Sequence, residues 1–177
     1  QAQQWGGWAA DAGHPPALAF FARAYLSAPK PTPEQIKLGL RALRFAADLA
    51  DPQAMTDWGA VLVEGRLGVP RNTYVGARWL ERAVALKNPN AMLRLAGLAN
   101  ANTGGVKGGR KRAMELTKQA AALNHPEAHF FLGQEAESRK AWAEAKDRYK
   151  LAADLGHPKA AAAAKRMLGM LRMLRSP

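Results

Sequence analysis

Histidines and a small group of acidic side chains are the residues of this sequence that could carry out catalysis or bind a metal ion. His125 and His129 stand four residues apart, which would place two imidazoles on one face of a helix, but no third ligand of a metal site suggests itself. The acidic residues stand among lysines and arginines, a pattern more typical of a solvated, salt-bridged face than of a paired acid and base. These acidic residues are Glu135, Glu137, Glu144 and Asp147.

A glycine-rich segment superficially suggests a phosphate-binding loop. Lys107 and Lys111 stand beside four glycines at positions 104, 105, 108 and 109. The spacing is not that of a P-loop, and no β-strand pattern precedes the segment. We therefore expect no catalytic residue, no resident metal ion and no cofactor.

Composition narrows the class of protein further. The chain has 177 residues, with 26 Lys or Arg against 14 Asp or Glu, a formal net charge of +12, and no Cys. A hydrophobic fraction of 48% is too high for intrinsic disorder. The absence of Cys excludes a disulfide scaffold, an iron–sulfur site and a thiol nucleophile. No apolar run approaches the roughly 20 residues needed to span a bilayer. The length is typical of a single domain, so residues 1–177 are expected to form one globular domain.

An internal repeat in the sequence sets where these residues lie in the fold. Five prolines, each followed two residues later by an alanine, stand 37, 37, 37 and 32 residues apart. The residue before each proline is His, Asp or Asn, so His14, His125 and His157 occupy equivalent positions, too far apart to share a metal ion. Small residues recur seven positions after the first four prolines. The prolines are Pro15, Pro52, Pro89, Pro126 and Pro158.

Each proline is predicted to open a helix. Proline is tolerated at the first helical position, and Asp51 and Asn88 are good N-cap residues. The first helices are expected to end near Ser27, Glu64, Asn102 and Ser138, and the second helices to begin near Pro33, Asn72, Gly109 and Ala141. The small residues allow close helix approach at the helical period. The predicted fold is all-α, a right-handed α-solenoid of stacked helix-turn-helix repeats.

The second unit carries the most specific pattern, in Trp58-Gly59, Glu64-Gly65, Gly68-Val69-Pro70-Arg71-Asn72 and Trp79-Leu80. This pattern resembles the Sel-one-like repeat, a relative of the tetratricopeptide repeat. The resemblance implies a non-enzymatic interaction protein, since members serve as adaptors, assembly factors and regulators, many in bacterial envelopes. Some small members are immunity proteins that neutralise a secreted toxin.

The repeat divides the chain into units. We assign a partial repeat to 2–14, repeats to 15–51, 52–88, 89–125 and 126–157, and a C-terminal capping helix to 158–175. That helix carries Met167, Leu168, Leu171 and Leu174 on one stripe, with basic residues outside it. The alternative interpretation is a basic amphipathic helix for an acidic membrane surface or a partner.

Two rows of residues on the first helices vary between units and are candidates for recognition. Five residues past the prolines stand Phe20, Asp57, Arg94 and Phe131, and eight past them stand Arg23, Ala60, Gly97 and Gln134. These rows share one face, which in such solenoids lines the concave surface, and aromatic and Arg side chains are frequent interface anchors. The phenylalanines could instead pack between repeats. The predicted partner-binding residues are Phe20, Arg23, Asp57, Arg94, Phe130, Phe131 and Gln134.

The positive charge is uneven. Residues 101–150 hold ten Lys or Arg against six acids, and a basic patch is predicted at Lys107, Arg110, Lys111 and Arg112. Such a field favours an acidic partner and salt-sensitive association.

The leading hypothesis is a module that binds an acidic protein partner through its concave face, as an envelope adaptor or an immunity-type inhibitor of a toxin. The alternatives are a nucleic-acid-binding repeat and an anionic glycan or membrane-surface binder. Against nucleic acid, Trp5, Trp8, Trp58 and Trp79 are not interleaved with basic residues as stacking platforms. Because the chain begins at Gln1, we expect a processed N-terminus and a periplasmic or secreted location, with the cytoplasm as the alternative.

Overall fold

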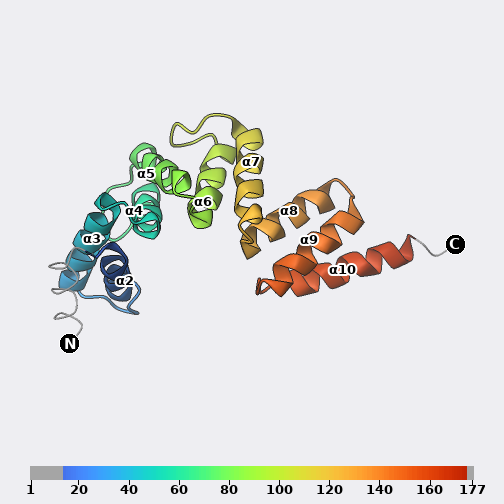
Figure 1. Ribbon diagram of the computed structural model, residues 1–177, viewed down its shortest axis with the longest axis horizontal. Coiled ribbons are helices and arrows are strands. Elements are labelled where there is room, and N and C mark those ends of the chain that lie inside the picture. The colour runs from blue at the N-terminus through green and yellow to red at the C-terminus, as the bar shows by residue number, and fades with distance from the viewer. Residues whose placement is uncertain (1–13, 175–177) are drawn as a thin grey trace.

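The computed structural model describes residues 14–174, and these form an extended array of antiparallel helix pairs (Figure 1). The first helices of the repeats are α2 (Pro15–Leu26), α4 (Pro52–Glu64), α6 (Pro89–Asn100) and α8 (Pro126–Ser138). The second helices are α3 (Pro33–Asp48), α5 (Thr73–Ala85), α7 (Gly109–Ala122) and α9 (Trp142–Asp154), and α10 (Ala160–Met173) follows. The predicted all-α solenoid is confirmed. The expected partial repeat at 2–14 falls almost entirely outside the described residues.

Capping explains why the first helices begin where they do. The Asp51 carboxylate accepts a hydrogen bond from the Ala54 N–H at 2.6 Å, and the Asn88 side-chain oxygen accepts one from the Ala91 N–H at 3.0 Å. Proline follows each cap at a position whose N–H needs no intrahelical partner. The four prolines from Pro15 to Pro126 therefore open helices as predicted. Pro158 does not, because α10 begins two residues later, at Ala160.

Small residues set the distance between paired helices. A Cβ added at Gly59 would stand 3.0 Å from the carbonyl oxygen of Gly76, and one added at Gly76 would stand 2.7 Å from that of Gly59. The backbones of α4 and α5 thus touch where the sequence has Gly on both sides. In the fourth repeat, Gly133 makes room for the ring of Tyr149 instead.

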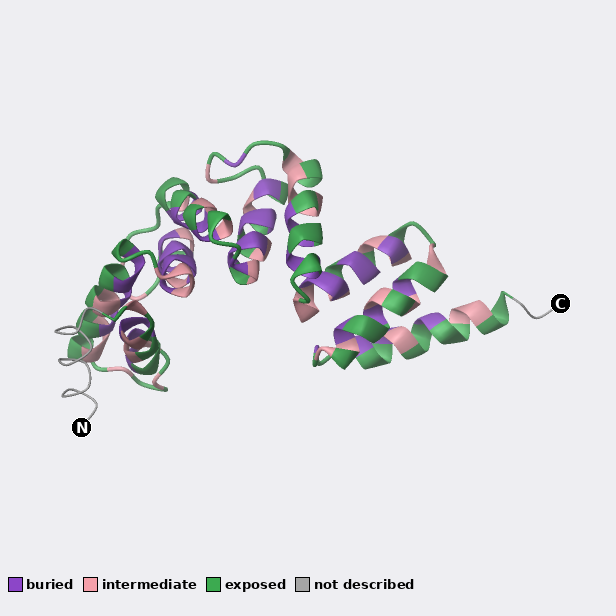
Figure 2. Cartoon of the chain, in the orientation of Figure 1, coloured by how far each residue is buried: buried purple, intermediate pink, exposed green. Residues whose placement is uncertain are grey.

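The core forms two clusters along the array. The larger runs from Leu18 in α2 to Leu132 in α8, and the smaller joins α8, α9 and α10 around Tyr149 and Met167. Figure 2 shows buried residues on the inward faces of the paired helices and exposed residues on the outer faces. Each helix buries its surface mainly against its neighbours in the chain, as in other solenoids.

The C-terminal helix α10 packs along α9 through only part of its apolar stripe. Met167 is fully buried, while Leu168 and Leu174 are exposed. The stripe predicted from spacing is therefore only partly a packing surface. Within the described residues, no helix is both long and apolar enough to cross a membrane.

Candidate partner-binding surface

The first helices α2, α4 and α6, which carry most of the two predicted rows, lie on the inner side of the arc. In Figure 1, α2, α4 and α6 lie on the inner side of the bend, with α3, α5 and α7 outside them. We call the surface formed by α2, α4 and α6 on this side the inner face. Its polar centre is Asp57 on α4, with Arg23 from α2 and Arg94 from α6 close enough to act on its charge.

Asp57 is half-buried and only partly paired. Its Oδ1 accepts a hydrogen bond from Gln53 Nε2 at 3.0 Å, while Oδ2 is buried without a hydrogen-bond partner among the described residues. Burial raises the pKa of the carboxyl, and the Gln53 hydrogen bond and the charges of Arg23 and Arg94 oppose that rise. Beneath the inner face there is thus an acceptor oxygen that no donor in residues 14–174 satisfies.

Two arginines that act on the charge of Asp57 share a second carboxylate. Glu64, at the end of α4, lies 3.1 Å from Arg94 Nη1 and 3.0 Å from Arg66 Nε. All three side chains are more than two-fifths exposed. Exposed pairs of this kind contribute about 0–1 kcal/mol, so the arginines can exchange Glu64 for a partner's carboxylate at little cost.

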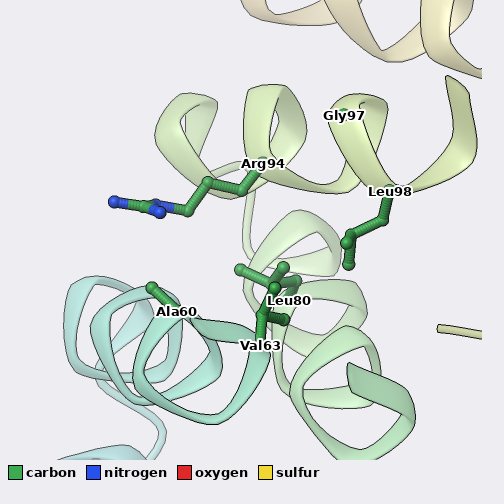
Figure 3. Close-up of a pocket in the computed structure, with 6 residues that line it drawn as sticks. All are labelled: Ala60, Val63, Leu80, Arg94, Gly97 and Leu98. Atoms are coloured by element: carbon green, nitrogen blue, oxygen red, sulfur yellow. The ribbon is translucent and has the colours of Figure 1, made fainter. Parts of the chain in front are cut away.

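An apolar hollow of about 180 Å³ lies between α4 and α6. Ala60, Val63, Leu80 and Leu98 line it together with Gly97 and the stem of Arg94. Figure 3 shows Leu98 pointing from α6 toward Leu80 and Val63, with Arg94 extending above Ala60. The hollow thus joins an apolar floor to a guanidinium at its rim.

The aromatic residues of the predicted set separate into two groups. Phe20 is 70% exposed on α2, and Phe131 is 42% exposed on α8 near the exposed Gln134. Phe130 is half-buried: its ring stacks on His157 at 4.1 Å between centroids and packs against Tyr149. Phe130 therefore lies in the smaller core cluster, which corrects its expected place on the variable face. Phe130 thus follows the alternative interpretation of the sequence, in which a phenylalanine packs between repeats.

Polar contacts that the sequence did not suggest link the start of one first helix to the chain just before the next repeat's proline. Asn88 Nδ2 and Asn90 Nδ2 each donate to Gln53 Oε1 at 3.4 Å, and His125 Nε2 lies 3.0 Å from Asn90 Oδ1. The contacts of Asn88 with Gln53 and of His125 with Asn90 each join the residue after one proline to the residue before the next, whereas Asn90 and Gln53 both follow a proline. Glu127 and His157 repeat the contact at 3.3 Å. The recurrence of His, Asp or Asn before the prolines was the available signal, and these contacts account for two of the three histidines.

His125 and His129 do not form a metal site with other residues. Within residues 14–174, no group of three His, Cys, Asp or Glu side chains is arranged to hold a metal ion. His129 is buried, and its Nδ1 lies 3.5 Å from Arg148 Nη1. Burial lowers the pKa of both histidines, with the charge of Arg148 adding to the effect at His129.

The predicted basic patch lies outside the inner face, at the connection from α6 to α7. Lys107, Arg110 and Lys111 are exposed, and Arg112 pairs with Glu115 at 3.5 Å. The same connection has Gly104 and Gly105 at positive φ and a buried Val106. The glycines serve the turn and the valine anchors it, while the basic side chains point to solvent.

Sequence reasoning missed three parts of this surface: Glu64, Arg66 and the hollow. The sequence indicated only that Glu64 ends a helix and that Arg66 lies in the turn after it. Their closeness to Arg94 depends on how far α4 is offset from α6. Nothing in a single helix pattern reports that offset.

No protein-family model matches this sequence, and no curated protein matches it significantly. Solved structures do match. A Sel1 repeat protein from Oxalobacter formigenes has a TM-score of 0.70 at 22% identity, over 83% of this chain and 57% of that one. A protective antigen with an SLR fold from uropathogenic Escherichia coli has a TM-score of 0.71 at 18% identity, over 88% of this chain and 33% of that one.

An immunity protein from Pseudomonas aeruginosa is also similar, with a TM-score of 0.61 at 24% identity over 88% of this chain and 56% of that one. The chain thus spans between a third and somewhat over half of the length of these three proteins. The similarity shows a common fold, the solenoid of the Sel1-like repeat.

Proposed function

We propose that this chain, which has the solenoid fold of Sel1-like repeat proteins, is a non-enzymatic module that binds an acidic protein partner through its inner face. The carrying observation is the cluster around Asp57. The charges of Arg23, Arg66 and Arg94 act on the Asp57 carboxylate, and two of these arginines also pair with Glu64. A cluster with excess positive charge and exposed guanidinium groups suits a protein surface that brings carboxylates.

The finer proposal is an immunity-type role, in which the partner is a toxin that this chain neutralises. Two solved structures with this fold, both from Pseudomonas aeruginosa, are immunity proteins. A net charge of +12 supports fast capture of an acidic partner, because long-range attraction raises the rate of encounter. The same charge makes capture weaken as salt is added.

The test is capture of cross-linked partners from cells that make the protein, read by mass spectrometry. Arg23→Glu with Arg94→Glu reverses two charges on the inner face. Lys107→Glu with Arg110→Glu makes the same change of net charge at the connection from α6 to α7. We expect the first pair to reduce recovery of an acidic protein at least tenfold and the second to reduce it less.

Three outcomes contradict the proposal. Loss of the partner only with the second pair moves binding to the basic patch. Recovery of RNA or DNA that survives physiological salt indicates a nucleic-acid-binding repeat. Sedimentation with anionic liposomes, lost on reversing Lys165 and Arg172, indicates a membrane-surface binder. Toxicity of the captured partner, relieved by co-expression of this chain, tests the immunity role separately.

A further inference from the structure

We infer that the hollow between α4 and α6 binds one apolar side chain of an extended, acidic segment of the partner, with an adjacent carboxylate of that segment on Arg94. This inference rests on the proposed function and names the chemistry that the inner face recognises. It concerns only the hollow and Arg94, so it can fail while the function stands.

The first step is the size and lining of the hollow. Its volume of about 180 Å³ is similar to the roughly 150 Å³ of an enclosed apolar cavity that binds benzene, and the hollow is open on one side, so it has room for a side chain the size of leucine. The side chains of Ala60, Val63, Leu80 and Leu98 are all apolar. A polar side chain placed there would lose its hydrogen bonds to water without gaining others.

The second step is the charge at the rim. Arg94 lines the hollow and also pairs with Glu64 at 3.1 Å, an exposed contact that a partner carboxylate can replace. Arg23, on the α2 side of Asp57, makes no ion pair within the described residues. The rim therefore favours an acidic segment over a basic one.

The probes are fluorescein-labelled nine-residue peptides in a Gly-Ser frame, measured by fluorescence polarisation with the full chain. The first has a central leucine between two glutamates. The second replaces the leucine with serine, and the third replaces the glutamates with lysines. We expect the first peptide to bind at least tenfold more tightly than either of the others.

Two variants assign the preference to the structure. Arg94→Glu should reverse the order of the glutamate and lysine peptides, which a damaged fold cannot do. Arg41→Glu, an exposed position on α3, makes the same change of net charge and should leave the order intact. Leu98→Trp should fill the hollow, removing the preference for leucine over serine while the preference for glutamate over lysine remains.

The inference is overturned if the leucine peptide binds no better than the serine peptide, which includes failure of both to bind. It is also overturned if Arg94→Glu and Arg41→Glu behave alike. If Leu98→Trp still captures the native partner in the cross-linking experiment, the partner-binding function stands and this use of the hollow does not.

Discussion

The helices α2 to α7 and the helices α8 to α10 use their charged groups differently. In the second region, Arg166 makes two contacts with Glu137 at 2.8 and 2.9 Å, and the Tyr149 hydroxyl donates to the same carboxylate at 2.6 Å. On the inner face of the first region, Asp57 keeps an unsatisfied oxygen and Arg94 has one exposed partner. Internally matched groups hold neighbouring helices together, whereas an exposed arginine with one exposed partner, such as Arg94, stays available for a binding partner.

The largest effect is expected in the core of the first region. Leu95 is 1% exposed, and Leu95→Ala should reduce the free energy of unfolding by about 2–5 kcal/mol, through lost burial and the cavity left behind. Urea denaturation followed by circular dichroism measures it. Leu86→Ala, at a residue 49% exposed, is the control and should cost within about 0.5 kcal/mol. Equal losses would contradict the placement of Leu95.

Removing Glu137 tests whether its contacts are structural. Glu137→Ala leaves the hydroxyl of the buried Tyr149 and the guanidinium of Arg166 without their shared acceptor, so we expect a loss of about 1–3 kcal/mol. Glu64→Ala on the inner face should cost no more than about 1 kcal/mol, because both of its arginine partners are exposed. A reversed order in the denaturation midpoints would remove the contrast between the two regions.

Two glycines test the contact between helix backbones. Gly59→Ala places a Cβ 3.0 Å from the Gly76 carbonyl oxygen, and we expect a loss of about 1–3 kcal/mol from overpacking. In Gly97→Ala the new Cβ has no atom within 4 Å, and the free energy of unfolding should rise by up to about 1 kcal/mol, because alanine is the better helix former. Thermal melts of the two variants should therefore move in opposite directions.

The smallest expected effect is a loss of folding stability as the pH falls. Burial lowers the pKa of His125 against the opposing charge of Glu127, so the folded protein takes up that proton at a lower pH than the unfolded chain. The stability contributed by the neutral ring is full above the unfolded pKa of about 6.5 and declines as the pH falls below it. His129 acts in the same direction.

Urea denaturation between pH 8 and pH 5.5 should show this decline. His125→Asn, which installs the residue found before Pro89, should make the decline shallower. His14→Asn is the matched control, since it exchanges the same side chain at an exposed equivalent position. A decline that is as steep in the His125 variant as in the parent would refute the assignment.

Most of the fold was predictable because its signals are local. Proline after a capping residue marks a helix start wherever it occurs, and glycine at matching positions marks close contact. Phe130 and Phe131 show what such local signals cannot predict. They are adjacent aromatic residues on one helix, and only the path of α9 and the position of His157 decide which is packed. The hollow depends in the same way on the separation of α4 and α6, which no residue type encodes.

The contacts between successive prolines tie the start of each unit to the last residue of the same unit. Gln53 meets Asn88, Asn90 meets His125 and Glu127 meets His157, so the units 52–88, 89–125 and 126–157 each have their own pair. A unit that moved to another place in the array would carry its pair with it. Gene duplication can therefore lengthen such an array without separating these partners.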